Sequence, residues 1–263
     1  MSSNSQPNRD RFKPSFALLP TLALLVVLLV GRTASAQTLQ LRYTFEDSGT
    51  TTTSDPGGAL SVPLNILNFP GTAADLHGAV GSGVNGSGKA LDFSSASNAV
   101  ASNLSGPIAQ VLGNPTLGTL GVVSNFTVAF WFKQDTTITN NQSRGGRFFL
   151  LATNGVTDQT GLTTNGVSVF YQNTNSIFLR MNSTIISLPV YYNPLPTNVW
   201  LFFAATYDGT NNCRLYFGSD VAPAKLASIR SFGPQIMDFG TGGGMLRCCS
   251  VTVRQIANGL STV

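Results

Sequence analysis

The alternation of apolar and polar side chains is the feature that most restricts the fold of this chain. In the segment Phe126–Phe132 the phenylalanines and Val128 share one face, whereas Trp131 lies on the other. A period of two residues is typical of a β-strand with one buried face. The segment Leu39–Phe45 repeats the pattern, and helical periodicity is hard to find anywhere after it.

Short runs of the same kind recur along the chain and are separated by Asn-Gly and Asp-Gly pairs, which favour turns with positive φ. Many short strands joined by such turns, without helices, predict an all-β sandwich or barrel. The span Ser48–Gly88 is rich in Gly, Ala and Thr, and we expect a long ordered connection there. The further predicted strands are Lys89–Phe93, Arg147–Thr153, Val167–Tyr171, Ser176–Met181, Val199–Tyr207 and Arg214–Gly218.

The first 36 residues resemble an export signal. Arg9, Arg11 and Lys13 precede the apolar run Phe16–Val30, and Ala34-Ser35-Ala36 provides small residues for cleavage before Gln37. The alternative is a membrane anchor, but the run is shorter than the roughly 20 residues that span a bilayer. We therefore expect a signal peptide over 1–36, one domain over 37–263, and a secreted or cell-surface protein.

The net charge argues against a nucleic-acid partner. The whole chain has 15 Lys and Arg against 11 Asp and Glu, and much of this excess lies in the predicted leader. The remainder is nearly neutral and its cations are scattered, which is unlike a surface that binds DNA or RNA.

The cysteines give no evidence of a metal site. Cys213, Cys248 and Cys249 are the only three, and a C-x-x-C zinc spacing is absent. One member of the adjacent pair can bond to Cys213, which would leave an odd thiol.

Hydrolytic chemistry lacks the residues it needs. Glycoside hydrolysis requires two carboxylates across the scissile bond, yet Glu46 is the single glutamate, and Asp92 and Asp208 stand apart from it. His77 is the only histidine, and we expect an exposed imidazole in a loop, with no G-x-S-x-G motif to pair with it. We predict that the chain is not an enzyme.

The segment GVNGSGKA (Gly83–Ala90) nearly matches a phosphate-binding loop. Ala90 stands where that loop has the hydroxyl that binds magnesium, and a strand is expected where a helix is required. We interpret the segment as a glycine-rich turn.

Four blocks together resemble the laminin-G-like domains of the concanavalin A-like lectin and glucanase superfamily, found in bacterial exported proteins. They are LRYTFED (Leu41–Asp47), GSGKALDFSSASNAV (Gly86–Val100), FTVAFWFK (Phe126–Lys133) and VWLFFAATYDGTNNCRLYFGS (Val199–Ser219). The resemblance covers most of the chain after the leader. It implies a jelly roll, that is, a two-sheet antiparallel β-sandwich.

The end of the chain departs from this pattern. Such domains usually close with a strand that pairs beside the first one, whereas here CCSVTVRQIANGLSTV follows GTGGGMLR (Gly240–Arg247). Either the closing strand has diverged, with Ser250–Ile256 in its place, or it is absent because the chain is truncated or frame-shifted.

The resemblance also implies a possible cofactor and a kind of ligand. Domains of this family often hold Ca²⁺ at a loop rim, and Glu46, Asp47 and Asp55 are the candidate ligands, since Ca²⁺ prefers several oxygen donors. We interpret most of six aromatics at strand positions as core: Trp131, Trp200, Phe130, Phe132, Phe202 and Phe203. The predicted ligand-binding residues are the aromatic rings and amides of Tyr171, Tyr191, Tyr192, Asn211 and Asn212.

These observations predict a secreted, non-catalytic module that binds carbohydrate or a cell-surface or matrix partner through loops at the rim of the sandwich. A structural or adhesive surface protein without specific sugar binding is the alternative, followed by a degenerate glycoside hydrolase. Sugar binding separates the first two, and the missing glutamate pair argues against the third.

Overall fold

The computed structural model describes residues 38–68, 71–93, 108–134, 147–153, 166–172, 176–182, 184–187, 196–239, 244–248 and 252–258. The chain divides into two compact units, Met1–Ser35 and Ala36–Val263, and the described residues belong to the second. The predicted leader, residues 1–36, lies outside them. Among the described residues no helix is long and apolar enough to cross a membrane.

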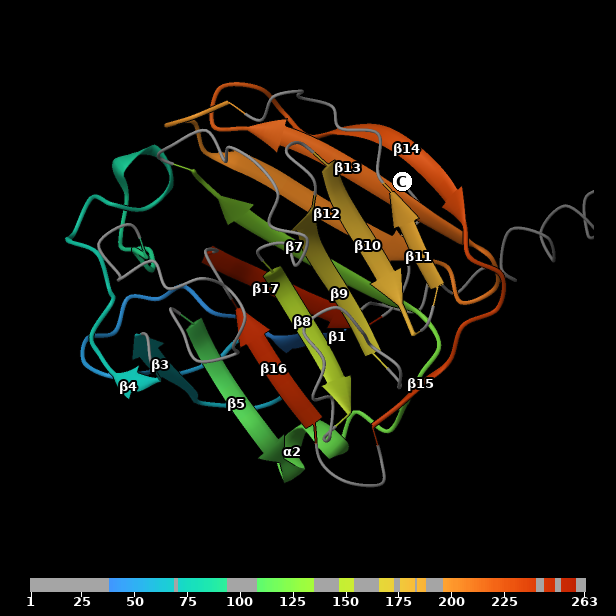
Figure 1. Ribbon diagram of the computed structural model, residues 1–263, viewed down its shortest axis with the longest axis horizontal. Coiled ribbons are helices and arrows are strands. Elements are labelled where there is room, and N and C mark those ends of the chain that lie inside the picture. Colours follow the sequence, from blue (N-terminus) through green and yellow to red (C-terminus); the bar gives the residue numbers. More distant parts are fainter. Residues whose placement is uncertain are drawn as a thin grey trace, which may run out of the picture. The chain divides into compact units, whose positions relative to one another are not determined.

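Two antiparallel sheets form the sandwich that the sequence predicts (Figure 1). The first sheet has six strands. Their spatial order is β1 (Thr38–Leu41), β17 (Thr252–Asn258), β7 (Phe126–Phe132), β12 (Leu201–Tyr207), β13 (Asn212–Ser219) and β14 (Lys225–Ser231).

The second sheet has nine strands. Their order is β11 (Thr184–Ser187), β10 (Ser176–Met181), β9 (Gly166–Gln172), β8 (Arg147–Thr153), β16 (Gly244–Cys248), β5 (Ile108–Asn114), β3 (Leu64–Asn68) and β2 (Thr51–Thr52), with β4 (Thr72–Ala73) paired to β3.

Three short elements complete the described part. A two-stranded ladder joins β6 (Val122–Val123) to β15 (Met237–Asp238). A 3-10 turn, η1, covers Val84–Gly86, and α2 covers Pro115–Gly118, where Asn114 caps the helix through Thr116 N at 2.8 Å.

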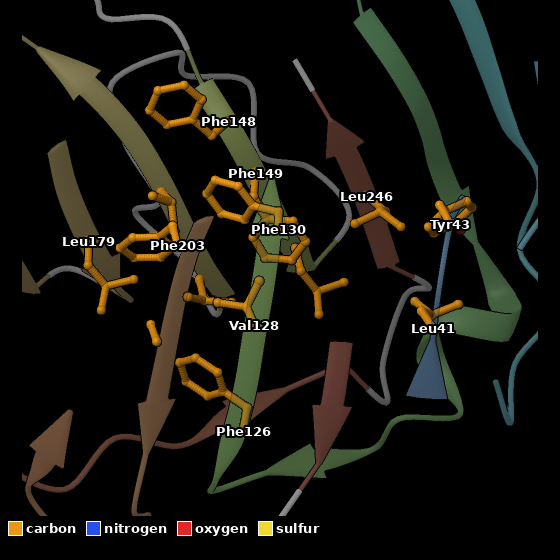
Figure 2. Close-up of a cluster of buried hydrophobic side chains, with 14 of the residues drawn as sticks. Leu41, Tyr43, Phe126, Val128, Phe130, Phe148, Phe149, Leu179, Phe203 and Leu246 are labelled. Carbon is orange, nitrogen blue, oxygen red and sulfur yellow. The ribbon is translucent and has the colours of Figure 1, made fainter. Parts of the chain in front are cut away.

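The core lies between the two large sheets, and the period of two residues explains its composition. The phenylalanines of β7 point toward the nine-stranded sheet, where Phe130 and Phe132 contact Phe148 with ring centroids 5.9 and 4.6 Å apart. Figure 2 shows Phe130 and Val128 among side chains from both sheets, with Leu41 and Tyr43 farther along the same layer. Each fully buried side chain of this size contributes about 1.5–3 kcal/mol through the area it removes from water.

The strand β17 lies between β1 and β7. Thr38 pairs with Asn258, and Val128 pairs with Ile256. The segment Ser250–Ile256, which the sequence offers as a diverged closing strand, overlaps β17. The choice between a diverged and an absent closing strand stays a prediction.

Two other predictions about elements are wrong. Lys89–Phe93 is not a strand, because only an isolated bridge joins Leu91 to His77. The span Ser48–Gly88 is not a mere connection, since β3 within it pairs with β5 in the nine-stranded sheet.

Candidate functional site

The face of the six-stranded sheet that is turned away from the core carries aromatic side chains. Along β7 and β12 the residues alternate, so that Trp131 and Phe202 lie outside while Phe130 and Phe203 lie inside. Strand register pairs Trp131 with Phe202, and their ring centroids are 5.1 Å apart. Tyr216 lies on the same face of β13 and is also half-buried. Phe130, Phe132, Phe203 and Trp200 are buried, as predicted for most of the strand aromatics, whereas Trp131 and Phe202 are half-buried on the outer face.

Small and polar side chains lie beside these rings on the same face. Ala129 pairs with Ala204, which pairs in turn with Tyr216. The next row joins Thr127, Thr206 and Arg214. We call this set of residues the outer-face patch: Trp131, Phe202, Tyr216, Ala129, Ala204, Thr127, Thr206 and Arg214.

The patch continues to the edge of the sheet. Leu226 pairs with Tyr216 and is 49% exposed, and Ile229 pairs with Arg214 and is 50% exposed. Apolar groups that adjoin on a solvent-facing surface mark interaction sites more often than scattered ones do. The patch is thus the described surface best suited to contact a ligand.

A second, smaller apolar cluster covers one end of the patch. Val84, Ala90 and Trp200 are buried together, and Trp131 packs against them. Lys133 places its ammonium nitrogen 5.2 Å from the centre of the Trp200 ring, a cation–π geometry. The glycine-rich turn Gly83–Ala90 therefore supports the aromatic end of the patch, consistent with its interpretation as a structural turn.

The predicted ligand residues Asn211 and Asn212 lie in the β12–β13 hairpin at the other end of the patch. Asn212 shares the outer face with Arg214, being two residues away on β13. Asn211 is exposed, but its carboxamide oxygen accepts hydrogen bonds from Ser231 Oγ and from Gly233 N, the latter at 3.0 Å. Asn211 thus fastens the hairpin, and Asn212 is the one that adjoins the patch.

Asp208 organises this hairpin. Its Oδ1 accepts hydrogen bonds from the amides of Thr210, Asn211 and Asn212, each at 2.9 Å. Gly209 has φ 85, as the Asp-Gly pair predicts. Partial burial raises the pKa of Asp208, but the three amides outweigh it and hold the pKa below its ordinary value.

The three predicted calcium ligands each have separate protein partners. Asp55 forms an ion pair with Arg42 at 3.0 Å and accepts from Thr44 at 2.9 Å. Both carboxylate oxygens of Glu46 lie 3.1 Å from the Lys89 amide.

Asp47 accepts hydrogen bonds from Thr52 and Thr53. Burial raises its pKa, but these hydrogen bonds, together with the charge of His77, lower it overall. Among the described residues no three His, Cys, Asp or Glu side chains are grouped to hold a metal ion. Calcium binding by the three carboxylates stays a prediction.

His77 is not the exposed imidazole that we expected. Its side chain is 2% exposed, and Nδ1 lies 2.8 Å from Asp75 Oδ1. Asp75 also accepts from Gly49 N at 2.7 Å, and these hydrogen bonds lower its pKa to about 2. The pair ties two loops together, which is a structural role.

The remaining predicted ligand residues are not tested here. Tyr171 belongs to β9 and pairs with Ile177, but its side chain lies outside the described part, as do Tyr191 and Tyr192.

Cys213 is a buried free thiol in the core, and burial raises its pKa to about 12.

A small pocket between the sheets is lined by apolar side chains, including Leu120, Phe126 and Phe239. This lining offers no polar side chain to a sugar, so the pocket is a packing defect of the core rather than a candidate glycan site.

Comparison with known proteins gives structural likeness only. No family model and no curated protein matches the chain. The carbohydrate-binding module CBM66 from Bacillus subtilis has a TM-score of 0.31 and 11% identity, over 58% of this chain and 79% of that one. The SAP-like pentraxin from Limulus polyphemus has a TM-score of 0.30 and 12% identity, over 52% of this chain and 63% of that one.

The binding domain of Paraclostridial Mosquitocidal Protein 1 has a TM-score of 0.41 and 11% identity, over 86% of this chain and 49% of that one. The matches thus span less than two thirds of the pentraxin and about half of the mosquitocidal chain. At these scores the fold and the site rest on the strand pairing and side chains of this chain alone.

Proposed function

We propose that this chain is a non-catalytic binding module that recognises carbohydrate through the outer-face patch. The observation that carries the proposal is the group of half-buried aromatic side chains, Trp131, Phe202 and Tyr216, in two neighbouring rows on the outer face of the six-stranded sheet. Rings of this kind offer a large apolar contact at a small entropic cost.

The polar neighbours of the rings favour a sugar over a purely apolar partner. Thr206 and Arg214 place a hydroxyl and a guanidinium group on the same face, whereas the hydroxyl oxygen of Thr127 is buried. A sugar presents C–H faces to rings and hydroxyls to hydrogen-bonding groups, so it uses both kinds of side chain. With Asn212 at its end, the patch reaches the rim where the sequence predicts ligand contacts, and export through the predicted leader would place it outside the cell.

The proposal is tested by binding of the purified protein to a panel of soluble oligosaccharides, followed by isothermal titration of the best ligand. Replacing Trp131 and Phe202 together by Ala should lower the affinity at least tenfold, because two stacking surfaces are removed. Phe170→Ala is the matched control, since Phe170 stacks on Phe178 on the other sheet with centroids 5.4 Å apart.

An unchanged affinity in the double variant, with circular dichroism like that of the wild type, would show that the sugar binds elsewhere. No binding by the wild-type protein to any glycan would favour the structural or adhesive alternative instead.

A further inference from the structure

Arg214 of the outer-face patch and Lys133, which borders the patch, form no ion pair with any carboxylate of the described residues. Arg214 lies between Thr206 and Ile229 in the strand register, and it takes part in none of the ion pairs of the described residues. Lys133 contacts the Trp200 ring and likewise has no acidic partner there. An unpaired cation beside aromatic rings is available to an anionic ligand.

The strands around the patch carry positive charges and no negative ones. The six strands of this sheet contain no aspartate or glutamate at all. Asp208, the carboxylate next to the patch on the β12 side, is turned into its hairpin by three amide hydrogen bonds. The cations in these strands are Arg214, Lys225, Arg230 and Arg254.

The distance between Lys133 and Arg214 along the sheet sets the length of the ligand. Lys133 follows the end of β7, and Arg214 lies in the row of Thr127, six residues earlier on that strand. At about 3.3 Å per residue the two rows are about 20 Å apart. Trp131, Phe202 and Tyr216 lie between these two rows. One extended chain of several sugar residues can therefore contact both cations and the aromatic side chains.

We infer that the ligand of the outer-face patch is an anionic oligosaccharide whose acidic groups meet Arg214 and Lys133 while its rings stack on Trp131, Phe202 and Tyr216. This inference rests on the proposed function and names the class of ligand that the same site takes. Carboxylated and sulfated sugars present the same charge, and the experiment distinguishes them.

The test is isothermal titration of the purified protein with matched pairs of oligosaccharides. One pair is oligogalacturonate and its methyl ester, and the other is a sulfated galactan oligosaccharide and its desulfated form. The acidic member of one pair should bind at least tenfold more tightly than its neutral partner. The affinity should also fall as salt rises from 50 to 500 mM, because exposed ion pairs are screened.

The charge variants locate the effect. Arg214→Gln and Lys133→Gln should each weaken binding of the acidic sugar about five- to tenfold and leave the neutral sugar unaffected. Arg230→Gln removes the same charge from the opposite face of the sheet edge, since Arg230 pairs with the core residue Cys213. This control should change the affinity less than twofold.

Equal binding of acidic and neutral sugars, abolished by the Trp131 and Phe202 double variant, would overturn this inference and leave the proposed function standing. Binding of the acidic sugar that is unchanged in Arg214→Gln would likewise overturn the inference. Failure of every oligosaccharide to bind would overturn both.

Discussion

Gly86 and Gly88 lie in the same turn, and substitution at each would destabilise the fold for a different reason. Gly86 and Gly88 have φ of +70° and +61°, which side chains rarely adopt. A Cβ on Gly86 would meet open space, whereas one on Gly88 would collide with the carboxylate of Glu46. Glu46 in turn accepts from the Lys89 amide, so the collision would break the contact that anchors the turn.

We therefore expect Gly86→Ala to cost about 1 kcal/mol of unfolding free energy, from the left-handed backbone alone. Gly88→Ala should cost at least twice as much. Urea unfolding of the two variants measures the difference. Equal losses would mean that Glu46 moves aside freely and that the turn does not depend on it.

Asp208 makes the hairpin sensitive to acid. Its pKa is lower in the folded chain than the ordinary value of 3.8, so it stabilises the fold above that value. This contribution is lost as the pH falls through 3.8 toward the lower folded pKa. The stability advantage of the wild type over Asp208→Asn should therefore be full at pH 6 and shrink between pH 5 and pH 3. Chemical unfolding at each pH measures it, and a constant difference would contradict the assignment.

Among the described elements, β14 is an edge strand of the six-stranded sheet and has two features that discourage further strand pairing. Its register with β13 shifts between Leu215 and Tyr216, and its core-side positions include Lys225 and Arg230, which pair with Phe217 and Cys213. Bulges and inward-pointing charges are devices that keep an edge strand from pairing with another chain.

Replacing Lys225 and Arg230 together by Val should therefore promote self-association, because the β14 edge becomes both apolar and β-prone. Light scattering at increasing protein concentration measures the apparent mass. The charge-reversal variant, with Glu at both positions, should behave like the wild type. A monodisperse Val variant would show that the bulge alone protects the edge.

At this scale the sequence predicted β7, β8, β9, β10, β12 and β13, and it missed others such as β3, β5 and β14. In β7, β12 and β13 a buried apolar residue stands at every second position, which makes a period of two residues visible. β14 reads KLASIRS, and its edge position and bulge break the alternation. Lys89–Phe93 has the composition of a strand but forms one bridge, because the chain there closes a loop.

For the candidate site, the sequence shows which residues of a strand share a face, but it does not show which face is turned toward solvent. The alternation of β7 places Trp131 on the face opposite Phe130, but the sequence does not show that Phe202 and Tyr216 of the neighbouring strands share that face, because this depends on the strand register. The burial of His77 could not be read from the sequence, since it depends on Asp75 and on the packing of two loops.

In the whole molecule, one continuous core joins the two sheets, and the charges are segregated around it. The described strands of both large sheets contain no aspartate or glutamate, and Asp47, Asp75 and Asp208 lie in connections, whereas Asp238 belongs to the short strand β15. Loop carboxylates accept hydrogen bonds from nearby amides, whereas strand cations extend from a surface whose own amides are paired. This division leaves the sheet faces basic although the chain after the predicted leader is nearly neutral.

The position of β17 bears on how such a chain is made. The described part gives β1 a single strand partner, and that partner is β17, near the other end of the sequence. During synthesis β1 emerges from the ribosome long before its partner exists, and so does the inner edge of β7. Contacts so distant in sequence form slowly. The six-stranded sheet therefore cannot be completed until synthesis has passed Asn258.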